Sequence, residues 1–184
     1  MNKTNLVFFD IDETLFSTTA LILVVKNGEI VKKLTNQEFN NYTLGEGEEF
    51  DFREFADAKK FAAESKPLMN VIRRLKEYVQ EGADVRLLTA RADFDCKDTF
   101  LNKFRSLGIP IDRIHVHRTG NLKIGSTPAE KKAIWVRRYI AANSYRVIKL
   151  YDDSKTNLRV FGALADEYPS IKFVPVYVEH GEVK

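Results

Sequence analysis

The chain has 184 residues, enough for one domain with a sizeable core, and its hydrophobic content of 44% and charged content of 30% are typical of a soluble globular protein. The net charge of +3 permits an anionic substrate and does not indicate stable nucleic-acid binding. The one cysteine, Cys96, cannot form an internal disulfide. The apolar run 20–25 is too short to span a bilayer, and no signal-peptide pattern opens the chain. We therefore expect a cytoplasmic protein with no membrane partner.

A buried strand that ends in two carboxylates is predicted first. Residues 6–9 are consecutive and apolar, as in the central strand of a parallel sheet. Asp10 and Asp12 follow two residues apart, so on an extended backbone their side chains share a face. Two like charges so close repel, and both carboxylates stay ionised only if a cation or strong hydrogen-bond donors offset them. Mg²⁺, which prefers oxygen ligands, would meet this need. Alternatively, the two aspartates only cap a turn.

A β-hairpin is predicted next, with strands at 21–26 and 29–34. Its Asn-Gly turn supplies the positive φ angles of a type I′ turn. A capping box that begins at Thr35 indicates a short helix. The glycine-rich acidic run 44–50 is interpreted as a solvated loop, and 52–63 is weakly helical.

Strands then alternate with helices, which predicts a three-layer α/β/α sandwich with a mostly parallel sheet. Local signals mark where the expected helices begin and end. They are glycines at the C-terminal ends, a Thr-Pro-x-Glu sequence at one start and a capping serine at another. The expected helices cover 67–81, 94–107, 127–142 and 154–167. The expected strands cover 83–88, 114–117, 146–151 and 171–178.

Three of these strands end in residues that suit one anionic ligand. The first ends at Asp10 and Asp12, another at Thr89, and a third at Asp152 and Asp153. Ligands of open α/β sheets bind beyond the carboxyl ends of the strands. Taken singly, Thr89 is a strand-end hydroxyl and the later aspartates are helix caps. Their joint occurrence predicts a common site.

Four segments resemble, in order, the motifs of the haloacid dehalogenase (HAD) superfamily of phosphohydrolases. They are Phe-Asp-Ile-Asp-Glu-Thr at 9–14, Leu-Thr at 88–89, a lysine at 131 or 132, and Leu-Tyr-Asp-Asp at 150–153. The resemblance covers nearly the whole chain and implies a HAD-like Rossmannoid fold. Glu13 departs from the pattern, since many members have glycine there; this leaves the loop geometry open.

The resemblance implies a Mg²⁺-dependent phosphomonoester hydrolase that acts through an aspartyl-phosphate. Asp10 is the implied nucleophile, and Asp12 is the implied general acid and base. The implied metal ligands are Asp10, the backbone carbonyl of Asp12, Asp153, and Asp152 through water.

The implied phosphate-binding groups are Thr89 and a motif lysine. The sequence leaves Lys131 and Lys132 open, with Lys132 favoured because the apolar residues Trp135 and Val136 then follow it, as apolar residues often do in the family. Arg91 completes a Thr-Ala-Arg run that resembles one in polynucleotide 3′-phosphatase domains. It is expected either to hold a substrate phosphate or to form a structural ion pair.

In this family, a cap inserted after the first or second motif selects the substrate, so the segments between the motifs predict how open the site is. The chain is expected to be a single HAD-like domain, 1–184, with residues 16–66 as a hairpin flap and small cap insert. This predicts an open site for a phosphorylated substrate such as a nucleotide, a nucleic-acid end or another phosphomonoester. The alternative is a HAD-fold binding or regulatory module with little turnover. A phospho-receiver domain fits less well, because no lysine ends a fifth strand.

Overall fold

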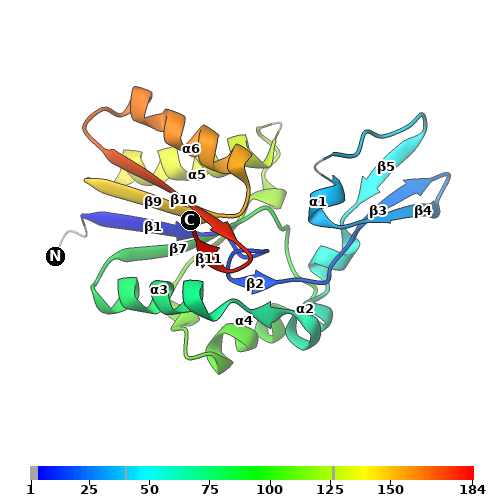
Figure 1. The fold of residues 1–184 in the computed structure, drawn as a ribbon, viewed down its shortest axis with the longest axis horizontal. Coiled ribbons are helices and arrows are strands. Elements are labelled where there is room, and N and C mark those ends of the chain that lie inside the picture. The colour runs from blue at the N-terminus through cyan, green and yellow to red at the C-terminus, as the bar shows by residue number, and fades with distance from the viewer. Residues whose placement is uncertain (1–3, 40, 126) are drawn as a thin grey trace.

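The computed structural model describes residues 4–39, 41–125 and 127–184, and its centre is a mostly parallel sheet (Figure 1). The strand order is β11-β10-β9-β1-β7-β8, and every neighbouring pair is parallel except β10–β11. The strands are β1 (Asn5–Phe9), β7 (Asp84–Thr89), β8 (Val116–Arg118), β9 (Val147–Asp152), β10 (Lys172–Glu179) and β11 (Glu182–Val183). The predicted mixed α/β fold with a mostly parallel sheet is therefore confirmed.

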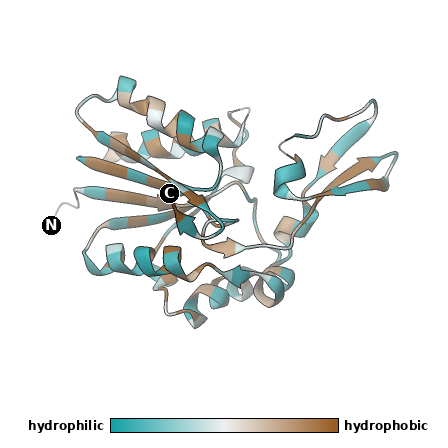
Figure 2. Ribbon diagram, viewed as in Figure 1, coloured by the Kyte–Doolittle hydropathy of each residue, from teal (hydrophilic) through white to brown (hydrophobic). Residues whose placement is uncertain are grey.

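Strand β1 carries apolar side chains to both faces of the sheet. Val7 and Phe9 pack in one core cluster, with residues of α3 (Met69–Gln80) and α4 (Lys97–Ser106). Leu6 and Phe8 pack in the other, with residues of α5 (Pro128–Ala142) and α6 (Lys155–Glu167). Figure 2 shows the hydrophobic strands between these helices. The continuous apolar run is thus explained by burial on both sides. Among the described residues, no helix is long and apolar enough to cross a membrane.

The chain order places β1 between two strands from later segments. Phe9 is in register with Leu87 of β7 and with Tyr151 of β9. The Asp10 N–H donates to the Tyr151 carbonyl over 2.9 Å, which extends the ladder one residue further. The carboxyl ends of three parallel strands therefore meet where the strand order reverses, the usual position of a ligand site.

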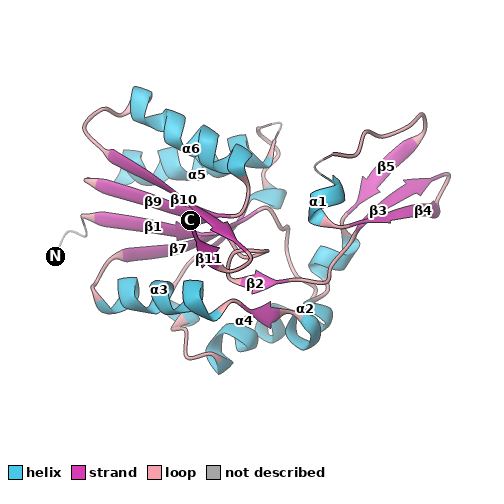
Figure 3. Ribbon diagram, in the orientation of Figure 1, coloured by secondary structure: helices cyan, strands magenta, loops and turns pink. Residues whose placement is uncertain are grey.

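The insert after β1 is built on a second, antiparallel sheet (Figure 3). Its order is β4-β3-β5, with β3 (Ile22–Lys26), β4 (Glu29–Leu34) and β5 (Glu48–Asp51). The predicted hairpin is confirmed, with φ of 53° at Asn27 and 83° at Gly28. The prediction of a loop over 44–50 is wrong at its end, because 48–50 pair with β3. Phe50 packs on the insert's small core, and this burial outweighs the acidic composition.

Short helices and a two-stranded ribbon complete the insert. The helices are α1 (Asn36–Phe39), the 3₁₀ turn η1 (Arg53–Ala56) and α2 (Ala58–Glu64). The predicted helix 52–63 is therefore divided into two, because Asp57 adopts an extended backbone and caps α2. Strand β2 (Phe16–Ser17) pairs antiparallel with β6 (Lys66–Pro67), which brings Phe16 into register with Pro67. Phe61 of α2 packs on Phe16 and Phe104, which anchors the insert to the main core.

His117 lies on the edge strand β8 beneath α5. Its ring stacks at 4.1 Å on Trp135 and shares a 2.8 Å hydrogen bond with the Tyr139 hydroxyl. Burial lowers the pKa of His117 to about 4, and four neighbouring basic groups act in the same direction: His115, Arg86, Arg118 and Arg138. These contacts give His117 a packing role.

We expect His117 to make the protein less stable in mild acid. Its pKa in the fold, about 4, is below its ordinary value of 6.5, so protons bind the unfolded chain more tightly. The contribution of His117 is complete above pH 6.5 and is lost as the pH falls toward 4. Thermal unfolding from pH 8 to pH 4 should show a smaller decline in His117→Asn than in wild type. The variant His180→Asn, at an exposed histidine that is not among these neighbours, should follow wild type; equal slopes in all three proteins would contradict the assignment.

Candidate active site

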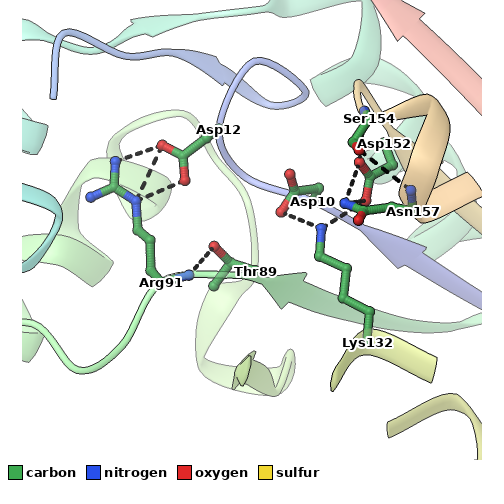
Figure 4. A network of polar contacts seen from close by, with 8 residues as sticks. All are labelled: Asp10, Asp12, Thr89, Arg91, Lys132, Asp152, Ser154 and Asn157. Carbon is green, nitrogen blue, oxygen red and sulfur yellow. Dashed lines mark hydrogen bonds and ion pairs between the residues drawn. The ribbon is translucent and has the colours of Figure 1, made fainter. Parts of the chain in front are cut away.

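Three carboxylates converge at the ends of β1 and β9. One oxygen each from Asp10, Asp152 and Asp153 lies within 4.8 Å of the other two. Figure 4 shows Asp10 and Asp152 of this cluster. Asp10 and Asp152 are buried, because the strands that carry them are central and the helices cover both faces. The predicted convergence of these strand ends is therefore observed.

Lys132 supplies the positive charge of this cluster. Its Nζ lies 3.0 Å from Asp10 Oδ1 and 2.7 Å from Asp152 Oδ2, and the residue is only 2% exposed. Helix α5 begins at Pro128 after a complete Thr127–Glu130 capping box, which fixes the turn from which Lys132 projects inward. Lys131 is half-exposed, and its stem passes beside Gly125. Of the two lysines left open by the sequence, the structure places Lys132 in the site.

Asp152 is held in place by donors from the start of α6. Its Oδ1 accepts from the Ser154 N–H (2.9 Å) and from Asn157 Nδ2 (3.0 Å), and Asn157 Nδ2 also lies 3.1 Å from Oδ2. With the Lys132 bond, both oxygens of Asp152 are occupied. Asp152 thus orients Lys132, and the sequence missed this role because it depends on a contact between β9 and α5.

The electrostatics of the cluster favour an additional cation. Burial raises the pKa of Asp10 well above its usual range despite the nearby Lys132 ammonium, and Asp152 and Asp153 raise it further. Burial, followed by the charge of Asp152, raises the pKa of Asp153 to about 7. Burial lowers the pKa of Lys132, but the flanking carboxylates outweigh it and hold that pKa above its ordinary value. Three carboxylates face one ammonium, so their oxygens could hold a metal ion.

Asp12 lies apart from the cluster and pairs with Arg91 (Figure 4). Arg91 Nε lies 2.9 Å from Asp12 Oδ2 and 3.2 Å from Oδ1, and Nη2 lies 2.6 Å from Oδ1. The ion pair, one of the two expectations for Arg91, is therefore present. The Thr89 hydroxyl, also buried, accepts from the Arg91 N–H over 3.1 Å. Phosphate binding by Thr89 and Arg91, and metal binding by the Asp12 carbonyl, stay predictions.

Glu13 adopts the backbone conformation that glycine usually supplies. Its φ is 55°, in the left-handed region that β-carbons disfavour. The Glu13 carboxylate accepts from the Thr18 N–H over 2.9 Å, and this bond steadies the loop. The departure from the HAD pattern therefore leaves a left-handed turn in place.

A cleft of about 420 Å³ opens beside Asp153. It lies between the insert and the C-terminal hairpin of β10 and β11, and its walls include Glu13, Gln37, Tyr177 and His180. The hairpin residues were not predicted as part of the site. They reach it because the chain reverses at 180–181, and the sequence carries no signal that this turn meets the insert.

Comparison with protein-family models and with curated proteins finds no match for this chain. The fold and the cluster define a mixed α/β protein with a buried carboxylate–lysine centre at the sheet's switch point. Its function is therefore argued from the residues themselves.

We expect Lys132→Met to destabilise the protein strongly. The substitution keeps the length of the side chain but leaves buried carboxylates without their ammonium, which costs about 3–5 kcal/mol. Urea unfolding in EDTA measures the loss. The matched variant Lys131→Met should change stability by no more than about 0.5 kcal/mol. Equal effects of the two variants would show that Lys132 does not balance the cluster.

Proposed function

We propose that this protein is a Mg²⁺-dependent phosphomonoester hydrolase of the HAD type. The observation that carries the proposal is the cluster of Asp10, Lys132, Asp152 and Asp153 at the meeting point of β1 and β9. A phosphoryl group needs a nucleophile, a fixed cation and room for a metal ion, and these residues can supply all three. The sandwich of helices around the sheet is compatible with a HAD-like Rossmannoid fold.

In this proposal Asp10 is the nucleophile. One carboxylate oxygen forms a bond to phosphorus while the bond from phosphorus to the leaving oxygen breaks, which yields an aspartyl-phosphate. Lys132 holds Asp10 in place and offsets negative charge that gathers as the phosphoryl group approaches. Water then attacks phosphorus, and the carboxylate of Asp10 is released together with inorganic phosphate.

Asp12 is the proposed general acid and base. It gives a proton to the leaving oxygen in the first step and takes one from the attacking water in the second. The separation of Asp12 from the carboxylate cluster supports this division of roles, because Asp12 is not needed to balance Lys132.

The groups that would hold Mg²⁺ are the carboxylates of Asp10 and Asp153, the backbone carbonyl of Asp12 and, through water, Asp152. When bound, the ion would neutralise charge that otherwise repels the carboxylate nucleophile from the phosphoryl group. The excess of carboxylates over ammonium supports this assignment. The raised pKa values of Asp10 and Asp153 are consistent with it, since burial and the neighbouring carboxylates disfavour the charged forms and a bound cation would offset both effects.

The substrate class is proposed from the cleft next to Asp153. A volume of about 420 Å³ is within the usual range for small-ligand sites and would accept the leaving group of a nucleotide or another small phosphomonoester. The insert would act as flap and cap, since 35–37 line this cleft. Nucleic-acid ends stay within the proposed class, and a screen of nucleotides, sugar phosphates and 3′- or 5′-phosphorylated oligonucleotides would rank them.

Asp10→Asn should abolish turnover and leave the fold intact. The amide has the shape of the carboxylate but is not a nucleophile, and removal of a nucleophile lowers kcat by a factor of about 10⁴ or more. Hydrolysis of p-nitrophenyl phosphate with Mg²⁺ measures turnover, and thermal unfolding checks the fold. A cooperative transition in the inactive variant supports the proposal; loss of that transition would mark Asp10 as structural.

A wild-type protein that turns over no phosphate ester in Mg²⁺ would favour the binding or regulatory module instead. In that case Asp10→Asn should still be examined for ligand binding. Replacement of the half-exposed neighbour Lys131 by Met serves as the control for surface changes near the site.

Removal of the metal should abolish activity and lower stability together. EDTA should eliminate turnover and added Mg²⁺ should restore it, because the ion would offset charge that Lys132 alone does not balance. Saturating Mg²⁺ should raise the melting temperature of wild type, by the usual linkage of binding to folding, and much less that of Asp153→Asn. Full activity in chelator, or equal thermal shifts in both proteins, would contradict the metal assignment.

A further inference from the structure

Each of the three nitrogens of the Arg91 guanidinium bonds a protein atom. Nε and Nη2 bond the Asp12 carboxylate, and Nη1 donates to the Phe55 carbonyl over 2.7 Å. The residue is 4% exposed. A substrate phosphate that took the Nε and Nη2 donors would have to displace the Asp12 carboxylate.

The insert encloses the same guanidinium. The Arg91 Cζ lies 4.8 Å from the ring centre of Phe55, 5.1 Å from that of Phe61 and 5.3 Å from that of Phe94. Phe55 lies in η1 and Phe61 in α2, so two of these rings and the accepting carbonyl come from the insert. Aromatic faces attract a guanidinium, most strongly where water is excluded.

The main chain of Arg91 is fixed from the core side. Its N–H bonds the Thr89 hydroxyl, and its carbonyl accepts from the Gly120 N–H over 3.2 Å. A β-carbon at Gly120 would lie 2.7 Å from the Ala92 nitrogen, so this close approach requires glycine. Arg91 therefore reaches from a rigid loop to two partners, Asp12 and the insert.

We propose that Arg91 is a positioning residue that ties the orientation of Asp12 to the placement of the insert. This inference rests on the proposed function, in which Asp12 transfers protons. Arg91 holds the Asp12 carboxylate away from the cluster of Asp10, Asp152 and Asp153, which would repel it. Because η1 and α2 hold the other side of the guanidinium, a shift of the insert over the cleft also shifts Asp12. Proton transfer is thus available only when the insert is seated.

Arg91→Lys tests the positioning role through the leaving group. An ammonium keeps the charge but cannot span both Asp12 oxygens and the Phe55 carbonyl. The value of kcat/KM is measured for β-glycerophosphate, whose alkoxide needs a proton, and for p-nitrophenyl phosphate, whose leaving group needs little help. We expect a loss of about 10²-fold for the alkyl ester and less than about 10-fold for the aryl ester, as for an impaired general acid. Arg86→Lys is the matched control, because Arg86 also forms an ion pair, with Asp84 in β7. It should change neither value by more than about 2-fold.

An equal loss for both esters would overturn the proposal, because a group that binds the phosphoryl moiety affects every ester alike. Wild-type turnover that disappears in Asp10→Asn would still support the proposed function in that case, so the two failures are distinguishable.

Phe55→Ala tests the tie to the insert, since it removes one ring that covers Arg91. It should reproduce the selective loss for the alkyl ester, whereas Phe52→Ala, at an exposed neighbour, should not. No selective loss in Phe55→Ala would overturn the coupling.

Discussion

Repulsion among buried carboxylates is the constraint on which the rest of the site depends. Asp10, Asp152 and Asp153 are brought together by two central strands, and their burial makes the charged forms unfavourable. Lys132 offsets part of this charge from the first turns of α5, and the N-terminal residues of α6 bond Asp152. The oxygens of these three carboxylates could hold a metal ion, because only one ammonium faces them.

The polar centre is divided into two networks with different partners. One joins Lys132 to Asp10 and Asp152, all on elements of the main sheet and its helices. The other joins Asp12 to Arg91 and then to Phe55 of the insert. The first network is built on rigid neighbouring strands, whereas the second crosses between the core and the insert. The proposed nucleophile is therefore independent of the insert, and the proposed proton carrier is not.

Local pattern was sufficient for most elements of the fold. The buried strand 6–9, the Asn-Gly hairpin, the capped start of α5 and the alternation of strands and helices follow from periodicity, turn chemistry and caps. The exceptions depend on distant partners. Strand β5 exists because Phe50 and its neighbours pair with β3, and no local preference in its acidic sequence indicates that.

For the site, the sequence pattern was enough to identify the chemical groups that end the strands: Asp10 and Asp12, Thr89, and Asp152 with Asp153. The sequence favoured Lys132 over Lys131 without excluding either, and the packing of α5 decided, because adjacent helix residues point about 100° apart and only one of them can face the sheet. Tertiary structure also paired Arg91 with Asp12 and brought the C-terminal hairpin to the cleft. These outcomes join segments far apart in the chain, and such contacts are set by how the elements pack.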